Sequence, residues 1–133
     1  MPEAIAALGE LTTLDASSNV LVSLPASFAG MRHLSSIDLS RNRLQELAPG
    51  LGALHSLAFL SVEDNALGQW PKDLVQCSSL TQLEAGGNVG LGLPADAHRL
   101  VSLRVLSLAG NQLTSLAGGD PDGGAQPASD AVT

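Results

Sequence analysis

The most constraining feature of this sequence is a 23-residue period. Its asparagines repeat at that interval, and three columns of mostly aliphatic residues keep the same interval. The asparagines are Asn19, Asn42, Asn65, Asn88 and Asn111, and the first aliphatic column holds Leu11, Leu34, Leu57, Leu80 and Leu103. Such a period indicates one small structural unit stacked on copies of itself, with each unit burying its apolar side against its neighbours. Stacked units present a repeated surface, which favours binding over catalysis.

Composition restricts both the core and the compartment. The chain of 133 residues has no Tyr, two Phe and one Trp, so the core must be aliphatic. A net charge of −7 argues against a nucleic-acid partner, which would need a basic surface. One cysteine cannot form an internal disulfide, and no apolar run approaches the ~18 residues of a membrane span. Because the N-terminal segment also lacks a signal-peptide pattern, we expect a cytoplasmic protein.

Each repeat predicts a short strand followed by a turn. In the second repeat, Leu34, Ile37 and Leu39 include a period-2 stretch, which is typical of a strand with one face inward. Asn42 follows where the chain turns, and a side-chain amide there can bond backbone groups that the turn leaves unpaired. The crossover rule for parallel strands predicts a right-handed solenoid. Its five strands are expected near residues 13–15, 36–38, 59–61, 82–84 and 105–107.

The pattern Leu34-x-x-Ile37-x-Leu39-x-x-Asn42-x-Leu44 resembles the leucine-rich repeat. The returning segments, which begin with Leu-Pro in several repeats, are similar to those of the intracellular class that includes Ras-suppressor, scribble and plant Ras-group proteins. Proline lacks an N–H, so it marks a turn out of the sheet. The resemblance implies an α/β solenoid with a parallel sheet on the concave face and short 3-10 or irregular segments on the convex face. It also implies a buried asparagine ladder.

Three segments are expected along the chain. Residues 1–10 form a partial leading repeat, residues 11–117 form the repeat domain with repeats starting at 11, 34, 57, 80 and 103, and residues 118–133 form a disordered tail. Neither end shows a capping pattern, so we expect a piece of a longer array, a truncated product, or ends that another chain covers. Uncovered ends would favour self-association, and Asn111 near one end should stabilise the fold less than Asn65. Gly90 interrupts a leucine column, where the adjacent Leu91 can substitute.

Residues that could carry catalysis do not converge. His33, His55 and His98 fall on returning segments, and Cys77 occupies an apolar core position. The glycine-rich segment 86–92 lacks the Lys and the helix of a phosphate loop. Carboxylates on adjacent repeats form a line rather than a metal cluster. We therefore expect a protein that is not an enzyme, with no catalytic residue, metal or cofactor.

The outward positions of the strands form the candidate binding site. Phe59 is the one aromatic residue there, and an exposed aromatic ringed by polar groups is typical of a binding hot spot. The alternative is a merely solvated face on which neighbours shield Phe59. The residues expected to contact a partner are Asp15, Asp38, Arg41, Phe59, Ser61, Glu63, Asp64, Gln82 and Glu84.

These features predict a scaffold or adaptor that binds a protein partner through the concave face, in intracellular signal transduction. The family resemblance points to small GTPases or their regulators as partners. The alternative is the regulatory or substrate-recognition arm of a larger enzyme, such as a kinase, phosphatase, ubiquitin ligase or cyclase. Five strands ~4.8 Å apart offer roughly 400 Å², about half of what one partner contributes to a standard interface, so the chain alone should bind weakly.

Overall fold

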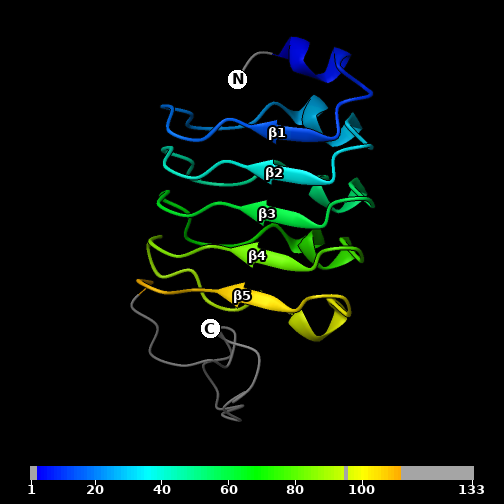
Figure 1. Ribbon diagram of the computed structural model, residues 1–133. Helices are drawn as coiled ribbons and strands as arrows, with labels where there is room; N and C mark the ends of the chain where they lie inside the picture. Colours follow the sequence, from blue (N-terminus) through cyan, green and yellow to red (C-terminus); the bar gives the residue numbers. More distant parts are fainter. Residues whose placement is uncertain (1–2, 95, 112–133) are drawn as a thin grey trace.

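The repeats form one parallel sheet in the computed structural model, which describes residues 3–94 and 96–111 (Figure 1). Five strands are hydrogen-bonded in the order in which they occur along the chain. They are β1 (Thr13–Asp15), β2 (Ser36–Asp38), β3 (Phe59–Ser61), β4 (Gln82–Glu84) and β5 (Val105–Ser107). Their register follows the sequence period, since Leu14 pairs with Ile37 and Ile37 with Leu60. The predicted parallel strands are therefore confirmed, with the predicted bounds.

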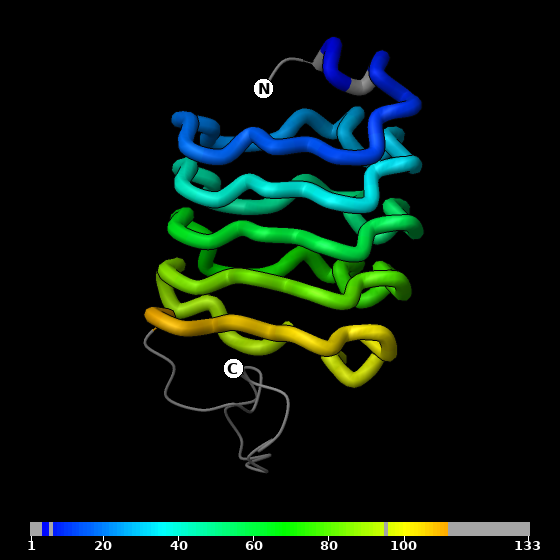
Figure 2. The backbone as a smooth tube through the Cα atoms, viewed as in Figure 1, coloured from blue at the N-terminus to red at the C-terminus, as the bar shows by residue number. Residues whose placement is uncertain are grey.

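Short 3-10 helices occupy the returning segments, and these run behind the sheet as a second layer (Figure 2). They are η1 (Glu3–Ala7), η2 (Ala26–Gly30), η3 (Leu51–Ala53), η4 (Lys72–Gln76) and η5 (Ala97–Arg99). Extended Pro25 and Pro71 precede η2 and η4. Few residues remain between one strand and the next, so no return holds a longer helix in the described part of the chain. The expected 3-10 returns are confirmed.

The core lies between the two layers and is aliphatic, as the composition predicted. The central residues of β2, β3 and β4, which are Ile37, Leu60 and Leu83, are fully buried. Leu14 at the centre of β1 is only half-buried because no described turn packs on its other side. Each inner repeat therefore depends on both neighbours for its burial, as expected for a stacked array.

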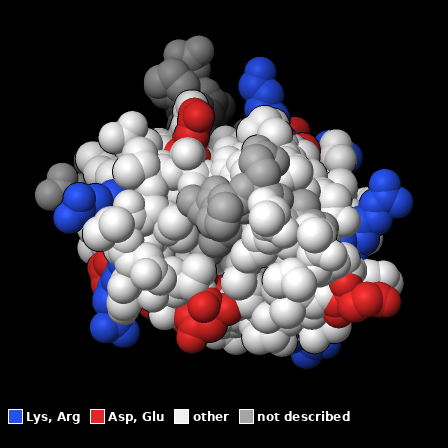
Figure 3. All heavy atoms as spheres, turned by 90° about the horizontal axis from the view of Figure 1, so that it is seen from above, with Lys and Arg blue, Asp and Glu red and all other residues white. Residues whose placement is uncertain are grey.

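The N-terminal end of the stack is largely uncharged, and Figure 3 looks directly onto it. Most of its charged side chains lie around the periphery of that view. Leu8, Val20 and Val22 are exposed at this end. The expectations for Leu113, Leu116 and the tail at 118–133 lie outside the described residues. Within the described part, the apolar surface at the first repeat is the open end of the array.

The repeat asparagines connect successive turns through backbone hydrogen bonds. Asn65 Nδ2 donates to the carbonyls of Val62 and Leu39, at 3.1 and 3.0 Å, and Asn65 Oδ1 accepts the N–H of Leu44 at 2.9 Å. Asn42 and Asn88 make equivalent bonds. One side chain therefore satisfies polar backbone groups on two adjacent turns, which would otherwise be buried without partners.

The two terminal asparagines of the ladder differ in burial and in hydrogen bonding. Asn111 is 1% exposed and bonds both its own repeat and the preceding one. Asn19 is exposed and donates only to Ala16 and Ser17 of its own repeat. The burial and hydrogen bonds of Asn111 do not support the expectation that it stabilises the fold less than Asn65, and Asn19 has the weaker connections.

The fourth repeat contains the predicted substitution at Gly90. Leu91 is 1% exposed, so its side chain fills the core position of the missing leucine. Its N–H also bonds Asn111 Oδ1 at 3.1 Å, the role that Leu67 performs for Asn88. Gly90 has a φ of 98°, a left-handed conformation in which glycine is favoured. This conformation accommodates the extra residue between Asn88 and the buried leucine.

Candidate functional site

The candidate site is the outward side of the sheet, which we call the strand face. Alternate side chains of a strand point to opposite sides, so the first and third residues of each strand lie on this face. Parallel register places equivalent residues side by side in two rows. The first row is Thr13, Ser36, Phe59, Gln82 and Val105, and the second is Asp15, Asp38, Ser61, Glu84 and Ser107.

The apolar part of the strand face has a different distribution from the one expected. Phe59 is half-buried between its neighbours Ser36 and Gln82, so only part of the ring can reach a partner. Val105 on β5 is exposed. Val105 was not among the expected contact residues, although its place in the same row as Phe59 was a usable signal. Apolar contact on this face therefore comes from two separated residues.

Four carboxylates form an acidic cluster, defined here as Asp38, Glu63, Asp64 and Glu84. Asp38 ends β2, Glu84 ends β4, and the other two lie in the turn after β3. Burial raises the pKa of the Glu63 carboxyl, the negative charges of Glu84, Asp64 and Asp38 raise it further, and Arg41 opposes them. The surroundings therefore disfavour the charged form of Glu63, and a cationic group from a partner would relieve this.

The turn that follows each strand has a left-handed residue, which the sequence reasoning missed. Ser18, Arg41 and Asp64 have φ values of 58°, 57° and 54°, and Gly87 and Gly110 in the same column also have positive φ. The two glycines in that column were the available signal. This conformation places Arg41 and Asp64 immediately before buried ladder asparagines, with both charged residues exposed.

Gly86 and Gly87 of the fourth repeat lie next to two carboxylates of the acidic cluster. A Cβ at Gly86 would lie 2.7 Å from the carbonyl oxygen of Ala109 and 3.5 Å from Glu63 Oε2. A Cβ at Gly87 would overlap the Asp64 carboxylate. Both carboxylates of the third repeat therefore extend over the glycines of the fourth. These carboxylates, together with the Ala109 carbonyl, occupy the space that side chains at Gly86 and Gly87 would need.

The remaining expected contact residues differ in accessibility. Ser61 is 3% exposed, because its short side chain lies between the longer Asp38 and Glu84 on the adjacent strands. A direct partner contact through Ser61 does not fit this burial. Gln82 donates through Nε2 to Glu84 Oε2 at 2.6 Å and holds that carboxylate in place. Asp15 is exposed and far along the row from Glu84.

Serines two residues downstream bind two of these aspartates. Ser17 donates its N–H and hydroxyl to Asp15 Oδ1, and these bonds lower the pKa of the Asp15 carboxyl. Ser40 donates in the same way to Asp38 Oδ1, at 2.9 and 2.7 Å. Both carboxylates are thereby held in one orientation on the strand face.

Groups that could suggest catalysis are dispersed. His33 lies 4.0 Å from Glu10 in an exposed contact, on the segment that leads into β2. Cys77 is buried as predicted, and burial raises the pKa of its thiol to about 11. Among residues 3–94 and 96–111, no group of three or more His, Cys, Asp or Glu side chains is arranged to hold a metal ion. Within the same residues, no helix has the length and apolarity to cross a membrane.

The fold and the strand face define a class of stacked-repeat solenoid with one open parallel sheet. Residues 33–54 and 102–123 match the family model described as Leucine Rich Repeat. Together with the repeat geometry, this match shows that the chain is built of leucine-rich repeats. No curated protein matches the sequence.

Solved leucine-rich repeat structures share the fold. One is the ectodomain of the plant membrane receptor kinase GASSHO1/SCHENGEN3 of Arabidopsis thaliana, in complex with CASPARIAN STRIP INTEGRITY FACTOR 2, with a TM-score of 0.74 and 30% identity over 85% of this chain. Internalin C2 of Listeria monocytogenes gives 0.70 and 28% over 86%. A leucine-rich repeat protein of Leptospira interrogans gives 0.58 and 27% over 86%. The chain spans 14%, 49% and 35% of their respective lengths.

Proposed function

We propose that this chain binds a protein partner through its strand face and acts as a scaffold or adaptor. The acidic cluster carries the proposal, because Glu63 is held beside three other carboxylates, and the carboxylates of Glu63 and Asp64 extend over glycines of the next repeat. A partner with Lys or Arg side chains would neutralise this charge. The complex of the GASSHO1/SCHENGEN3 ectodomain offers a precedent for partner binding by this fold.

The partner is expected to combine a basic patch with an apolar group. Charges at an interface mainly steer association and select the partner, whereas buried apolar contacts slow dissociation. Phe59 and Val105 supply the apolar contacts, and Arg41 beside the cluster would fix the orientation. Intracellular signalling and a cytoplasmic location belong to the proposal, with small GTPases and their regulators as the first partners to test.

The test compares variants against a partner obtained by affinity capture and then purified. Glu63→Gln combined with Glu84→Gln should reduce the association rate and weaken its dependence on salt. Phe59→Ala should weaken binding by about 1–2 kcal/mol, somewhat less than a fully exposed hot spot. His98→Ala, on η5, is the matched control and should leave binding unchanged. If His98→Ala abolishes binding and the strand-face variants do not, the partner uses the returning segments instead.

A second proposal is that the repeats serve as the recognition arm of a larger enzyme. It is supported by the similarity to the receptor kinase ectodomain, of which this chain spans only 14%. Sequencing the full-length transcript tests this directly. An adjoining kinase, phosphatase, ligase or cyclase domain would support the recognition-arm function, and its absence from the transcript would rule it out.

A further inference from the structure

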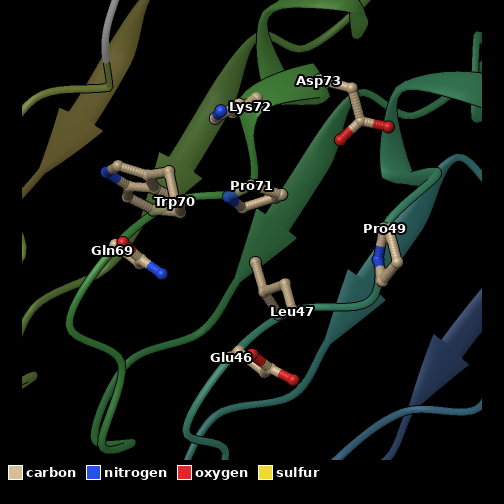
Figure 4. A pocket seen from close by; sticks show the side chains of 8 residues that line it. All are labelled: Glu46, Leu47, Pro49, Gln69, Trp70, Pro71, Lys72 and Asp73. Atoms are coloured by element: carbon tan, nitrogen blue, oxygen red, sulfur yellow. The ribbon is translucent and has the colours of Figure 1, made fainter.

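A hollow of about 440 Å³ lies between the returning segments of the second and third repeats (Figure 4). It is separate from the strand face, because its lining residues follow the strands and lead into η3 and η4. Leu47, Pro49, Trp70 and Pro71 supply its apolar lining. We call this hollow the Trp70 groove. Its volume falls in the range of about 300–1,000 Å³ that is usual for ligand sites.

The Trp70 groove arises where two departures from the repeat meet. Leu-Pro begins the return at Leu24 and Leu93, but the second repeat has Leu47-Ala48-Pro49, with the proline one position later. Gly50 then adopts a φ of 92° before η3, whereas Pro71 is extended before η4. The backbones of these neighbouring returns therefore enter their helices in different conformations beside the hollow, whereas Gly52 of η3 packs closely against Asp73 of η4.

Trp70 is the second departure, since it replaces the leucine of the other returns. Its indole Nε1 donates to the carbonyl oxygen of Gly92 in the next repeat at 2.8 Å. This bond fixes the edge of the ring toward the fourth repeat. In Figure 4, the ring lies at one side of the hollow, opposite Pro49, with Leu47 and Pro71 between them. The groove thus has a rigid aromatic wall rather than a mobile side chain.

Opposite charges lie at the two rims of the groove. Glu46 lies on one side and Lys72 on the other in Figure 4, and both residues are exposed. In the described part of the chain, neither makes an ion pair. The third charged residue, Asp73, already accepts the N–H of Gly52 at 3.1 Å. An occupant of complementary charge therefore carries a basic group for Glu46 and an acidic group for Lys72.

We propose that the Trp70 groove binds an extended, proline-containing segment of a partner protein, flanked by one basic and one acidic side chain. Flat proline and tryptophan rings suit the surface of a polyproline II segment, which has no internal hydrogen bonds and loses little conformational entropy on binding. The chain's own residues 112–133 fit less well, because they contain three Asp and no Lys or Arg to pair with Glu46.

The sequence provides a direct optical test, because Trp70 is the single tryptophan and the chain has no tyrosine. The probe is a set of decapeptides with a central Pro-Leu-Pro, in which one Arg and one Asp flank the core at varied spacing. At least one peptide should change the Trp70 emission in a saturable manner. Versions with the prolines replaced by Gly, or with both charges replaced by Gln, should bind more weakly.

Variants of the protein locate the site by calorimetry. Trp70→Leu restores the residue used in other returns and should lower the affinity about tenfold or more, as loss of an aromatic anchor does. Glu46→Gln and Lys72→Gln should each lower it by about twofold to fivefold, the range for exposed charge pairs. Phe59→Ala should not change it. Thermal melts confirm that each variant is folded.

Three results would overturn the proposal. They are no emission change with any peptide of the set, equal binding of the proline-free versions, and equal binding to Trp70→Leu. Loss of peptide binding in Phe59→Ala instead would move the site to the strand face. A self-association of the chain that Trp70→Leu abolishes would make a second copy the occupant. The proposal on the strand face uses different residues, so either can fail without the other.

Discussion

The backbone N–H of Leu44 donates to Oδ1 of Asn65 at 2.9 Å, so a side chain of the third repeat fixes the turn of the second. The same Asn65 amide donates to Leu39 in the second repeat and to Val62 in its own. Each ladder asparagine therefore bonds two turns at once, and the stability of a turn depends on the repeat that follows it.

Asn65→Ala should lower the free energy of unfolding by about 1–3 kcal/mol, the typical cost of leaving buried polar groups without partners. Asn111→Ala should have a similar effect because Asn111 has equivalent bonds and burial. Asn19→Ala is the control and should cost less, since Asn19 is exposed and bonds only its own repeat. Urea titrations measure all three, and equal losses at Asn19 and Asn65 would contradict the geometry.

Gly86→Ala should destabilise the protein by about 1–3 kcal/mol, the usual cost of forcing atoms into a packed site. The added Cβ would lie 2.7 Å from the Ala109 carbonyl oxygen, which belongs to the backbone of the next repeat and cannot rotate away. Gly68→Ala is a matched control, because nothing lies within 4 Å of its Cβ position. Thermal melts of both variants test this, and equal melting temperatures would show that the repeats can separate without cost.

Glu63→Gln should stabilise the protein near neutral pH. Burial and neighbouring carboxylates raise the pKa of Glu63 above its ordinary value of 4.5. Below that ordinary value both folded and unfolded chains hold the proton, and no penalty exists. As the pH rises to the folded-state pKa and beyond, the unfolded chain ionises more readily, so the wild type loses stability relative to the variant.

The gain in Glu63→Gln should stay below about 1 kcal/mol, because solvent screens a partly exposed charge. Denaturant titrations at pH 7, and again below the ordinary glutamate pKa, measure the difference between the two proteins. The difference should shrink at the lower pH and in high salt. A constant difference at both pH values would mean that it does not arise from the charge of Glu63.

Cys77 should resist thiol reagents in the native protein. The side chain is fully buried, and burial raises the pKa of the thiol to about 11, so the reactive thiolate is scarce at neutral pH. The labelling rate should therefore follow opening of the surrounding repeats and increase with urea. Rapid stoichiometric labelling without denaturant would show that the third return opens freely.

The open N-terminal end should promote self-association. Val20 is 65% exposed in the first repeat, in which Leu8 and Val22 are also exposed. Val20→Lys should reduce association in sedimentation experiments, since burying apolar surface contributes about 25 cal/mol per Å². Val89→Lys is the matched control, because Val89 occupies the same repeat position and is 70% exposed, but lies away from that end. Equal effects of both variants, or a monomer at every concentration, would contradict this prediction.

The strands were predictable because strict repetition averages out local ambiguity. Leu14, Ile37, Leu60, Leu83 and Leu106 occupy one aligned column, so the expected strands could be centred on it and matched the observed ones. The substitution of Leu91 for Gly90 was predictable for the same reason, since a vacant core position next to a leucine has one simple solution. Both inferences use spacing, which the sequence states directly.

The exposure of site residues was less predictable. Ser61 is buried because of the lengths of Asp38 and Glu84 on adjacent strands, which depends on side-chain packing rather than spacing. The half-burial of Phe59 between Ser36 and Gln82 also depends on side-chain packing. Predicting the Trp70 groove would have required the backbone path of two returning segments. In the sequence, only the departures from the repeat at Pro49 and Trp70 were visible.

The hydrogen bond from the Leu91 N–H to Asn111 Oδ1 joins residues 20 apart in the sequence, whereas the equivalent bond from the Leu67 N–H to Asn88 Oδ1 joins residues 21 apart. The third and fourth repeats are therefore equally long. The fourth, however, has one more residue in the corner after its asparagine and one fewer in its returning segment. The corner between Asn88 and Leu91 is therefore a place for loop grafting. A foreign epitope inserted there would enlarge an exposed corner, while the strand register on either side would stay unchanged.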